Sequence, residues 1–211
     1  MKHLSVFVGF LGLLACSDAT GQAEEAPKIT PQATAVAKAE ISPTITANWT
    51  MDKTKSTLAF SGNQSGEAFT GKFENFDAVI NFNPNDLAAA KVVVTIDTNS
   101  ADAGKAERTD ALPSKEWFYV KKFPVAKFVS DDFKLLESDK YTAKGNLTIR
   151  DITQEIVLPF TLKVKNGRAT MDAAFTLNRT AYKIGTGMWA SEDWVGHDIA
   201  VNVHLEADQN K

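Results

Sequence analysis

The fold is decided by the stretch YTAKGNLTIRDITQEIVLPFTLKV, residues 141–164. On both sides of a polar connection, residues 150–154, apolar side chains recur at every second position. Side chains on a β-strand alternate between the two faces of a sheet, so this stretch predicts a hairpin with one apolar and one wet face. The apolar face must pack against a second sheet or against the inside of its own closed sheet.

The same alternation recurs along the rest of the chain. It is present in residues 57–60, 76–82, 92–96, 126–130, 171–177 and 199–205. Between residues 100 and 118 the alternation stops and Ala, Lys and Glu accumulate, which predicts a short helical insertion. About eight short strands with one such interruption are typical of an antiparallel sandwich or barrel.

Composition excludes several function classes. The 211 residues are 44% hydrophobic and carry a formal net charge of −3, with Lys and Arg scattered rather than clustered, so we expect no nucleic-acid partner. One cysteine and three histidines supply too few ligands for a metal or haem carrier, and we expect no cofactor. His197 precedes Asp198, but no Gly-x-Ser-x-Gly motif accompanies them, so we predict that the protein is not an enzyme.

Residues 1–15 predict a signal peptide, because charged Lys2 is followed by a short apolar run. Leu13-Leu14-Ala15-Cys16 also resembles a bacterial lipobox, in which the peptidase cuts before a cysteine that then carries lipid. This resemblance predicts lipidation of Cys16 and attachment to a membrane. An ordinary signal peptide that ends beside a free thiol is the alternative.

The segment 16–46 is rich in Ala, Thr, Pro and Glu, and it contains no aromatic residue. We expect a lipidated Cys16 followed by a disordered tether, then a folded domain over residues 47–208 and a tail over 209–211. Ser17 follows the cysteine; by resemblance to enterobacterial sorting rules, this favours the outer membrane. The expected location is therefore a periplasm-facing site in the bacterial cell envelope.

Several short motifs occur together and in order across residues 48–206. They are Trp49-Thr50-Met51-Asp52, Ser56-x-Leu58-x-Phe60, Gly71-x-Phe73, Arg108-x-Asp110-x-Leu112, Trp117-Phe118, Phe123-Pro124-x-Ala126-x-Phe128-x-Ser130, Tyr141-x-Ala143-x-Gly145-x-Leu147-Thr148-Ile149 and Asn178-Arg179-x-x-Tyr182-x-Ile184-Gly185. Together they resemble the YceI family of periplasmic polyisoprenoid-binding proteins. Two positions depart from that pattern: Lys55 replaces a frequent His, and Tyr119 replaces a frequent Asp.

The resemblance implies an extended, lipocalin-like eight-stranded antiparallel β-barrel with a central tunnel. The tunnel would hold a long-chain isoprenoid, such as a polyprenyl lipid or an isoprenoid quinone, for carriage, storage or buffering. Barrels of about eight strands are wide enough inside to hold one slender ligand. The alternative is a barrel filled by its own side chains, which would act as a protein-interaction module.

Inward positions on the predicted strands are the candidate ligand contacts. They are Phe60, Phe76, Ile80, Phe82, Val94, Ile96, Leu147, Ile149, Leu158, Phe160, Phe175, Leu177, Val201 and Val203. Candidates for the tunnel mouth or a polar head group are Arg108, Asp110, Trp117, Arg179, Trp189 and Trp194. Alternation alone does not distinguish a lined tunnel from a filled core. Outward apolar residues leave a homodimer possible, namely Val79, Val93 and Val157.

Overall fold

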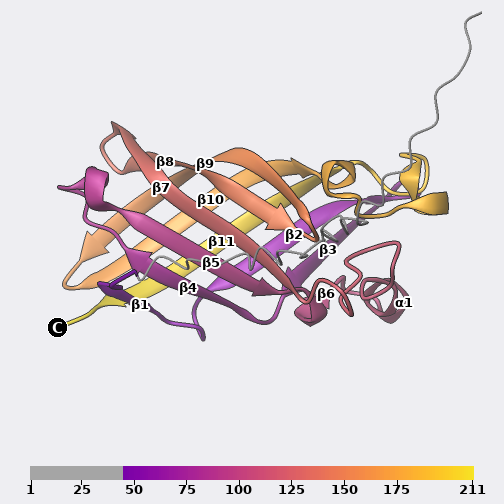
Figure 1. The fold of residues 1–211 in the computed structure, drawn as a ribbon, viewed down its shortest axis with the longest axis horizontal. Helices are drawn as coiled ribbons and strands as arrows, with labels where there is room; N and C mark the ends of the chain where they lie inside the picture. Colours follow the sequence, from indigo (N-terminus) through magenta and orange to yellow (C-terminus); the bar gives the residue numbers. More distant parts are fainter. Residues whose placement is uncertain (1–44) are drawn as a thin grey trace, which may run out of the picture. The chain divides into compact units, whose positions relative to one another are not determined.

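The computed structural model describes residues 45–211, and most of them belong to a single antiparallel sheet (Figure 1). Its strands are β1 (Trp49–Met51), β2 (Thr57–Gln64), β3 (Glu67–Phe73), β4 (Phe76–Asn81), β5 (Lys91–Asp97), β6 (Ala101–Asp102), β7 (Val125–Glu137), β8 (Lys140–Ile149), β9 (Ile152–Lys165), β10 (Arg168–Asn178) and β11 (Asp198–Gln209). The predicted signal peptide, the lipidation site Cys16 and the tether up to residue 44 lie outside the described residues.

The sheet closes on itself, which decides between barrel and sandwich. The neighbours run β1-β4-β5-β7-β8-β9-β10-β11, and β11 pairs with β1 again. One edge of β11 pairs with β1 near its C-terminal end and with β2 nearer its N-terminal end. β3 then pairs with β2, and β6 pairs with β3. The predicted fold class, an eight-stranded antiparallel barrel, is therefore confirmed.

The hairpin of residues 141–164 differs from its prediction at the turn. The connection is only Arg150 and Asp151, and the ladder resumes with Ile149 opposite Ile152. Thr153, which was predicted to lie in the loop, is part of β9, where its hydroxyl lies 2.8 Å from that of Thr148. Arg150 supplies the left-handed residue that so short a turn requires, with φ of 59°.

The helical insertion contains one α-helix, α1 (Ala106–Ala111), preceded by the 3-10 turns η1 (Leu87–Ala89) and η2 (Thr98–Ser100). The N-cap residue of α1 is Lys105, and its side chain makes no capping hydrogen bond. Instead, the Asp102 carboxylate accepts hydrogen bonds from Gly104 N at 2.8 Å and Thr109 Oγ1 at 2.9 Å. These two bonds fix the loop that leads into α1.

A second long loop, residues 179–197, follows β10 and contains η3 (Arg179–Tyr182) and η4 (Gly187–Ala190). Figure 1 shows this loop and α1 beyond the same end of the barrel. At the other end of the strands, β11 extends to Gln209 and pairs with Trp49, so the predicted tail begins inside a strand. Within residues 45–211, no helix is both long and apolar enough to cross a membrane.

Candidate functional site

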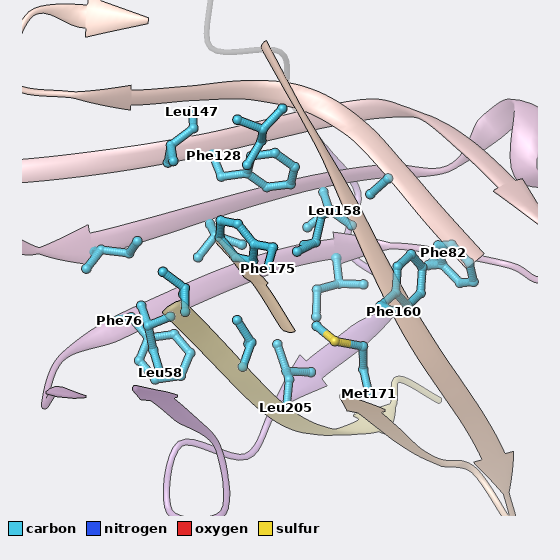
Figure 2. Close-up of a pocket in the computed structure, with 18 of the residues that line it drawn as sticks. Leu58, Phe76, Phe82, Phe128, Leu147, Leu158, Phe160, Met171, Phe175 and Leu205 are labelled. Atoms are coloured by element: carbon cyan, nitrogen blue, oxygen red, sulfur yellow. The ribbon is translucent and has the colours of Figure 1, made fainter. Parts of the chain in front are cut away.

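An apolar cavity of about 200 Å³ runs inside the barrel, and every residue that lines it is apolar. The side chains converge on this space from β1, β2, β3, β4, β5, β7, β8, β9, β10 and β11, and Figure 2 shows ten of them with labels. This arrangement follows from the two-residue period of the strands, which sends every second side chain inward. Thirteen of the predicted contacts line this cavity, namely Phe76, Ile80, Phe82, Val94, Ile96, Leu147, Ile149, Leu158, Phe160, Phe175, Leu177, Val201 and Val203.

An aromatic cluster lies at the end of the cavity near β1. Phe82 packs edge-on against Phe133, with ring centroids 5.3 Å apart, and Tyr141 stacks on Phe160 with centroids 5.4 Å apart. Trp49 is 5% exposed, and its indole N–H donates to the carbonyl of Phe82 at 2.9 Å. These rings fill the barrel at this end.

A second cavity of about 540 Å³ lies toward α1 and the 179–197 loop. It shares part of its wall with the first cavity, and the two adjoin at the residues Phe73, Phe118, Ile149, Leu177 and Val201. Unlike the first, it is also lined by polar side chains, among them Gln64, Glu67, Lys105, Glu107, Arg108 and Arg179. Phe60, the remaining predicted contact, lines this second cavity.

Arg179 holds the wall of the second cavity together. It is 2% exposed, and its five N–H donors bond backbone carbonyls at 2.6–3.0 Å, those of Ile184, Gly185, Trp189, Val195 and Gly196. An arginine has five such donors, so none is left for a head group. The prediction that Arg179 binds a head group is therefore corrected to a structural role.

Burial lowers the pKa of Arg179, but the group stays charged because an arginine starts so high. Among the described residues, no carboxylate forms an ion pair with it, since the carbonyl oxygens take that place. The guanidinium lies over the ring of Trp117, with its carbon 5.8 Å from the ring centroid. The second cavity therefore carries a buried positive charge in its wall.

Two further predicted mouth residues, Arg108 and Trp117, line this cavity. Arg108 gives its Nε–H to Gln64 at 2.6 Å and lies 3.9 Å from Glu67, which is largely exposed. Trp117 packs against Trp189 with ring centroids 5.9 Å apart, and its buried indole N–H has no hydrogen-bond partner among the described residues. A buried donor without a partner costs about 1–3 kcal/mol, so a ligand that accepts this hydrogen bond would recover that cost.

Two other mouth predictions are not supported by the geometry. Asp110 is exposed on α1, and Trp194 is 49% exposed in the 179–197 loop; neither lines the first or the second cavity. Both residues lie in segments that lack the strand alternation, so the sequence alone does not indicate which way their side chains point.

Several lining residues were missed. Leu58, Phe128, Ile156, Leu162, Met171 and Leu205 all line the first cavity, and each continues a two-residue alternation that the sequence shows. Phe133 is different, because a bulge between Ser130 and Asp132 shifts the ladder by one residue. That shift reverses the alternation within β7 and brings Phe133 inward.

No group of three or more His, Cys, Asp or Glu side chains in residues 45–211 could hold a metal ion. His197 Nε2 lies 2.8 Å from the carbonyl oxygen of Ala190, and His204 Nδ1 lies 2.7 Å from the carboxylate of Asp172.

Comparison with known proteins agrees with this geometry. The model of the YceI-like domain matches residues 49–207. The chain belongs to the YceI-like family. The UPF0312 protein YE1254 of Yersinia enterocolitica is 43% identical over 88 residues, 42% of this chain and 45% of that protein. Protein YceI of Salmonella arizonae is 42% identical over 88 residues, 42% and 46% of the two chains. The matched segment thus spans about half the length of these curated relatives.

Solved structures of the YceI-like fold resemble the barrel. BcnA of Burkholderia cenocepacia superposes with a TM-score of 0.71 at 29% identity, covering 74% of this chain and 98% of its own. A domain from Saccharophagus degradans, described as polyisoprenoid-binding, gives a TM-score of 0.65 at 14% identity, covering 78% and 99%. The latter likeness concerns the fold alone.

Proposed function

We propose that this protein binds one long-chain isoprenoid lipid without chemical turnover, as a carrier, store or buffer in the bacterial cell envelope. A polyprenyl lipid and an isoprenoid quinone both have the necessary shape. The observation that carries the proposal is the continuous apolar cavity inside a closed barrel. The name of the Saccharophagus degradans domain supports the same class of ligand.

The energetic argument needs no directional contact along the chain. Burial of apolar surface contributes about 25 cal/mol per Å², and every side chain along the first cavity is apolar. The alternative, a barrel filled by its own side chains that binds only protein partners, predicts no cavity at this place. The polar second cavity then receives the head group.

The groups around the second cavity favour a head group that accepts hydrogen bonds. Its wall contains the buried charge of Arg179, the half-buried Arg108 and the unpartnered N–H of Trp117. A quinone carbonyl or a phosphate oxygen would accept from the Trp117 indole and from the Arg108 donors that Gln64 does not take, while Arg179 contributes only its charge. A ligand with its prenyl chain in the first cavity and its head group in the second would occupy both cavities.

Attachment to the envelope is a separate part of the proposal. It rests on the lipobox-like Leu13-Leu14-Ala15-Cys16, with the outer membrane favoured by Ser17. Metabolic labelling with a radioactive fatty acid is expected to label the wild-type protein. Loss of signal in Cys16→Ser would support acylation at that residue, whereas an unlabelled wild-type protein would contradict it.

A matched pair of variants tests ligand binding in the full chain. Leu158 lines the first cavity, whereas its neighbour Val157 is 56% exposed on the outer face. Leu158→Trp is expected to weaken binding of a long-chain isoprenoid quinone at least tenfold, about 1.4 kcal/mol, because the indole occupies the ligand's space. Val157→Trp is expected to bind within twofold of the wild type.

Binding is measured by native mass spectrometry and by quinone quenching of tryptophan fluorescence. A wild-type protein that neither co-purifies with lipid nor binds added quinone or polyprenol would contradict the proposed function. Equal affinities of the Leu158→Trp and Val157→Trp variants would place the ligand outside the barrel.

A further inference from the structure

The wall of the barrel is incomplete between β9 and β10. These strands pair only from Arg168 opposite Lys165 to Ala173 opposite Phe160. Beyond that point β9 still extends back to Ile152, and β10 continues to Asn178. We call the unpaired part, residues 152–159 of β9 and 174–178 of β10, the seam.

The outer neighbours of both strands remain paired along the seam. β9 pairs with β8 as far as Ile152 opposite Ile149, and β10 pairs with β11 as far as Asn178 opposite Asp198. The strands are thus regular here, and only their pairing with each other is lost. At about 3.3 Å per residue, the five residues of β10 give the seam a length of roughly 17 Å.

Pro159 provides a reason in the sequence for the position of the seam. It is the first β9 residue beyond the last pair, and in the same register it would face Ala174. Proline has no backbone N–H, so it is found in sheets mainly where one side of the strand is unpaired. The ladder ends where a donor is missing.

The seam opens over the first cavity. The inward residues on its two sides are Ile156 and Leu158 from β9, and Phe175 and Leu177 from β10, and all four line that cavity. They are only half-buried, whereas Ala143, opposite Leu158 on β8, is 3% exposed. The residues that border the seam on the cavity side are therefore apolar on both strands.

Packed side chains close both ends of the seam. At one end Phe160 stacks on Tyr141, with ring centroids 5.4 Å apart. At the other end Ile152 and Leu177 pack against the cluster that contains Tyr182 of η3, which is 1% exposed. An opening bounded in this way has a fixed position and a limited length.

We propose that the seam is a lateral portal, through which a long apolar chain enters and leaves the barrel sideways. The inference rests on the proposed binding of such a chain. End-on passage from the second cavity would thread the whole chain past Phe73 and Phe118, which pack edge to face with ring centroids 5.7 Å apart where the two cavities adjoin. Sideways passage needs only a small separation of two strands that share no hydrogen bonds there.

Cross-linking across the seam tests the portal. Val157 and Thr176 are outward-facing, and the register extended from the last pair places them opposite each other. In a Cys16→Ser background, Val157→Cys and Thr176→Cys are joined with short bifunctional maleimides of increasing span. The matched control joins Ala174→Cys to Asn202→Cys, which pair directly across the intact β10–β11 ladder.

The measured quantities are the rates of loading and release of a long-chain isoprenoid quinone. Closing the seam is expected to slow both rates at least tenfold, while the control cross-link leaves them within twofold. Cross-linked protein that loads and releases at the control rates would overturn the portal. Absence of equilibrium binding to the unlinked protein would instead overturn the proposed function.

Hydrogen exchange tests the seam without any cross-link. Amides of residues 174–178 that face β9 are expected to exchange at least tenfold faster than the corresponding amides of 168–173. Added quinone is expected to slow the exchange of the seam amides. Equal protection of both halves of β10 in the free protein would overturn the portal, because the edges would then be bonded.

Discussion

Replacement of Arg179 by methionine is expected to destabilise the protein more than any other single change of an arginine in the barrel domain. Methionine keeps an unbranched, apolar stem but removes the five donors of the guanidinium. Three of the five carbonyls are buried, those of Ile184, Gly185 and Val195. The variant leaves these oxygens without a partner.

The magnitude follows from the number of buried acceptors. A buried polar group without a partner costs about 1–3 kcal/mol, which for three carbonyls gives at least about 3 kcal/mol. Relief from burying a cation offsets part of the upper range, so we expect a loss of about 3–5 kcal/mol in the free energy of unfolding. Since domains are stable by about 5–15 kcal/mol, the variant should fold but remain marginal.

Urea unfolding followed by tryptophan fluorescence measures this loss. Arg108→Met is the matched control, because Arg108 makes one hydrogen bond to Gln64 and a long ion pair with the exposed Glu67. It should cost about 1 kcal/mol or less, as exposed pairs usually do. Equal losses in the two variants would refute the assignment of Arg179 as the residue that holds the loop.

A second substitution probes the same contact from the other side. Gly185 has φ of +72°, and a Cβ there would lie 3.0 Å from the guanidinium carbon of Arg179. Gly185→Ala should therefore destabilise the loop both by backbone strain and by displacement of the guanidinium. An effect near zero would show that the loop adapts and that the five bonds are individually weak.

Two further changes have definite expected outcomes. A Cβ on Gly145 would clash with the backbone carbonyl oxygen of Val129 and lie 2.8 Å from the ring of Phe128, so Gly145→Val should strain the β7–β8 ladder, displace that ring, cost at least about 1–3 kcal/mol and reduce lipid capacity in native mass spectrometry. Hydrogen bonds from Gly104 and Thr109 hold the pKa of Asp102 below its ordinary value. The ionised carboxylate of Asp102 therefore stabilises the folded protein fully above the pKa that Asp102 has in the unfolded chain, about 4. This stabilisation is lost as the pH falls through the lower pKa of the folded state. Thr109→Val should raise the pKa of Asp102 in an NMR titration, and an unchanged pKa would contradict the role of that hydroxyl.

The sequence could predict most of the tunnel lining because the strand period fixes the direction of each side chain. Every inward candidate from Phe60 to Val203 lines one of the two cavities. Closure of the sheet was not determined by alternation, since a sandwich would show the same pattern. Closure depends on β1 reaching both β4 and β11, a long-range pairing that leaves no local signal.

The loops were predicted less well, for a physical reason. Arg179 was a candidate for the head group because an arginine after a strand has no obvious partner. Its actual partners are carbonyls of residues 184–196, and only the folded loop brings these oxygens to one point. Trp117 lines the second cavity, but its unpartnered N–H depends on packing that alternation does not describe.

The barrel has two walls of different character, and this difference connects the tunnel with the seam. On β7 and β8 the inward residues Phe128, Leu147 and Ile149 are 6–7% exposed, and the two strands pair along most of their length. On β9 and β10 the inward residues along the seam, Ile156, Leu158, Phe175 and Leu177, are half-buried, and part of the ladder is missing. Bound lipid would therefore complete the packing mainly of the second wall. Ligand-induced protection from hydrogen exchange should concentrate on β9 and β10, and uniform protection of all strands would argue against a mobile wall.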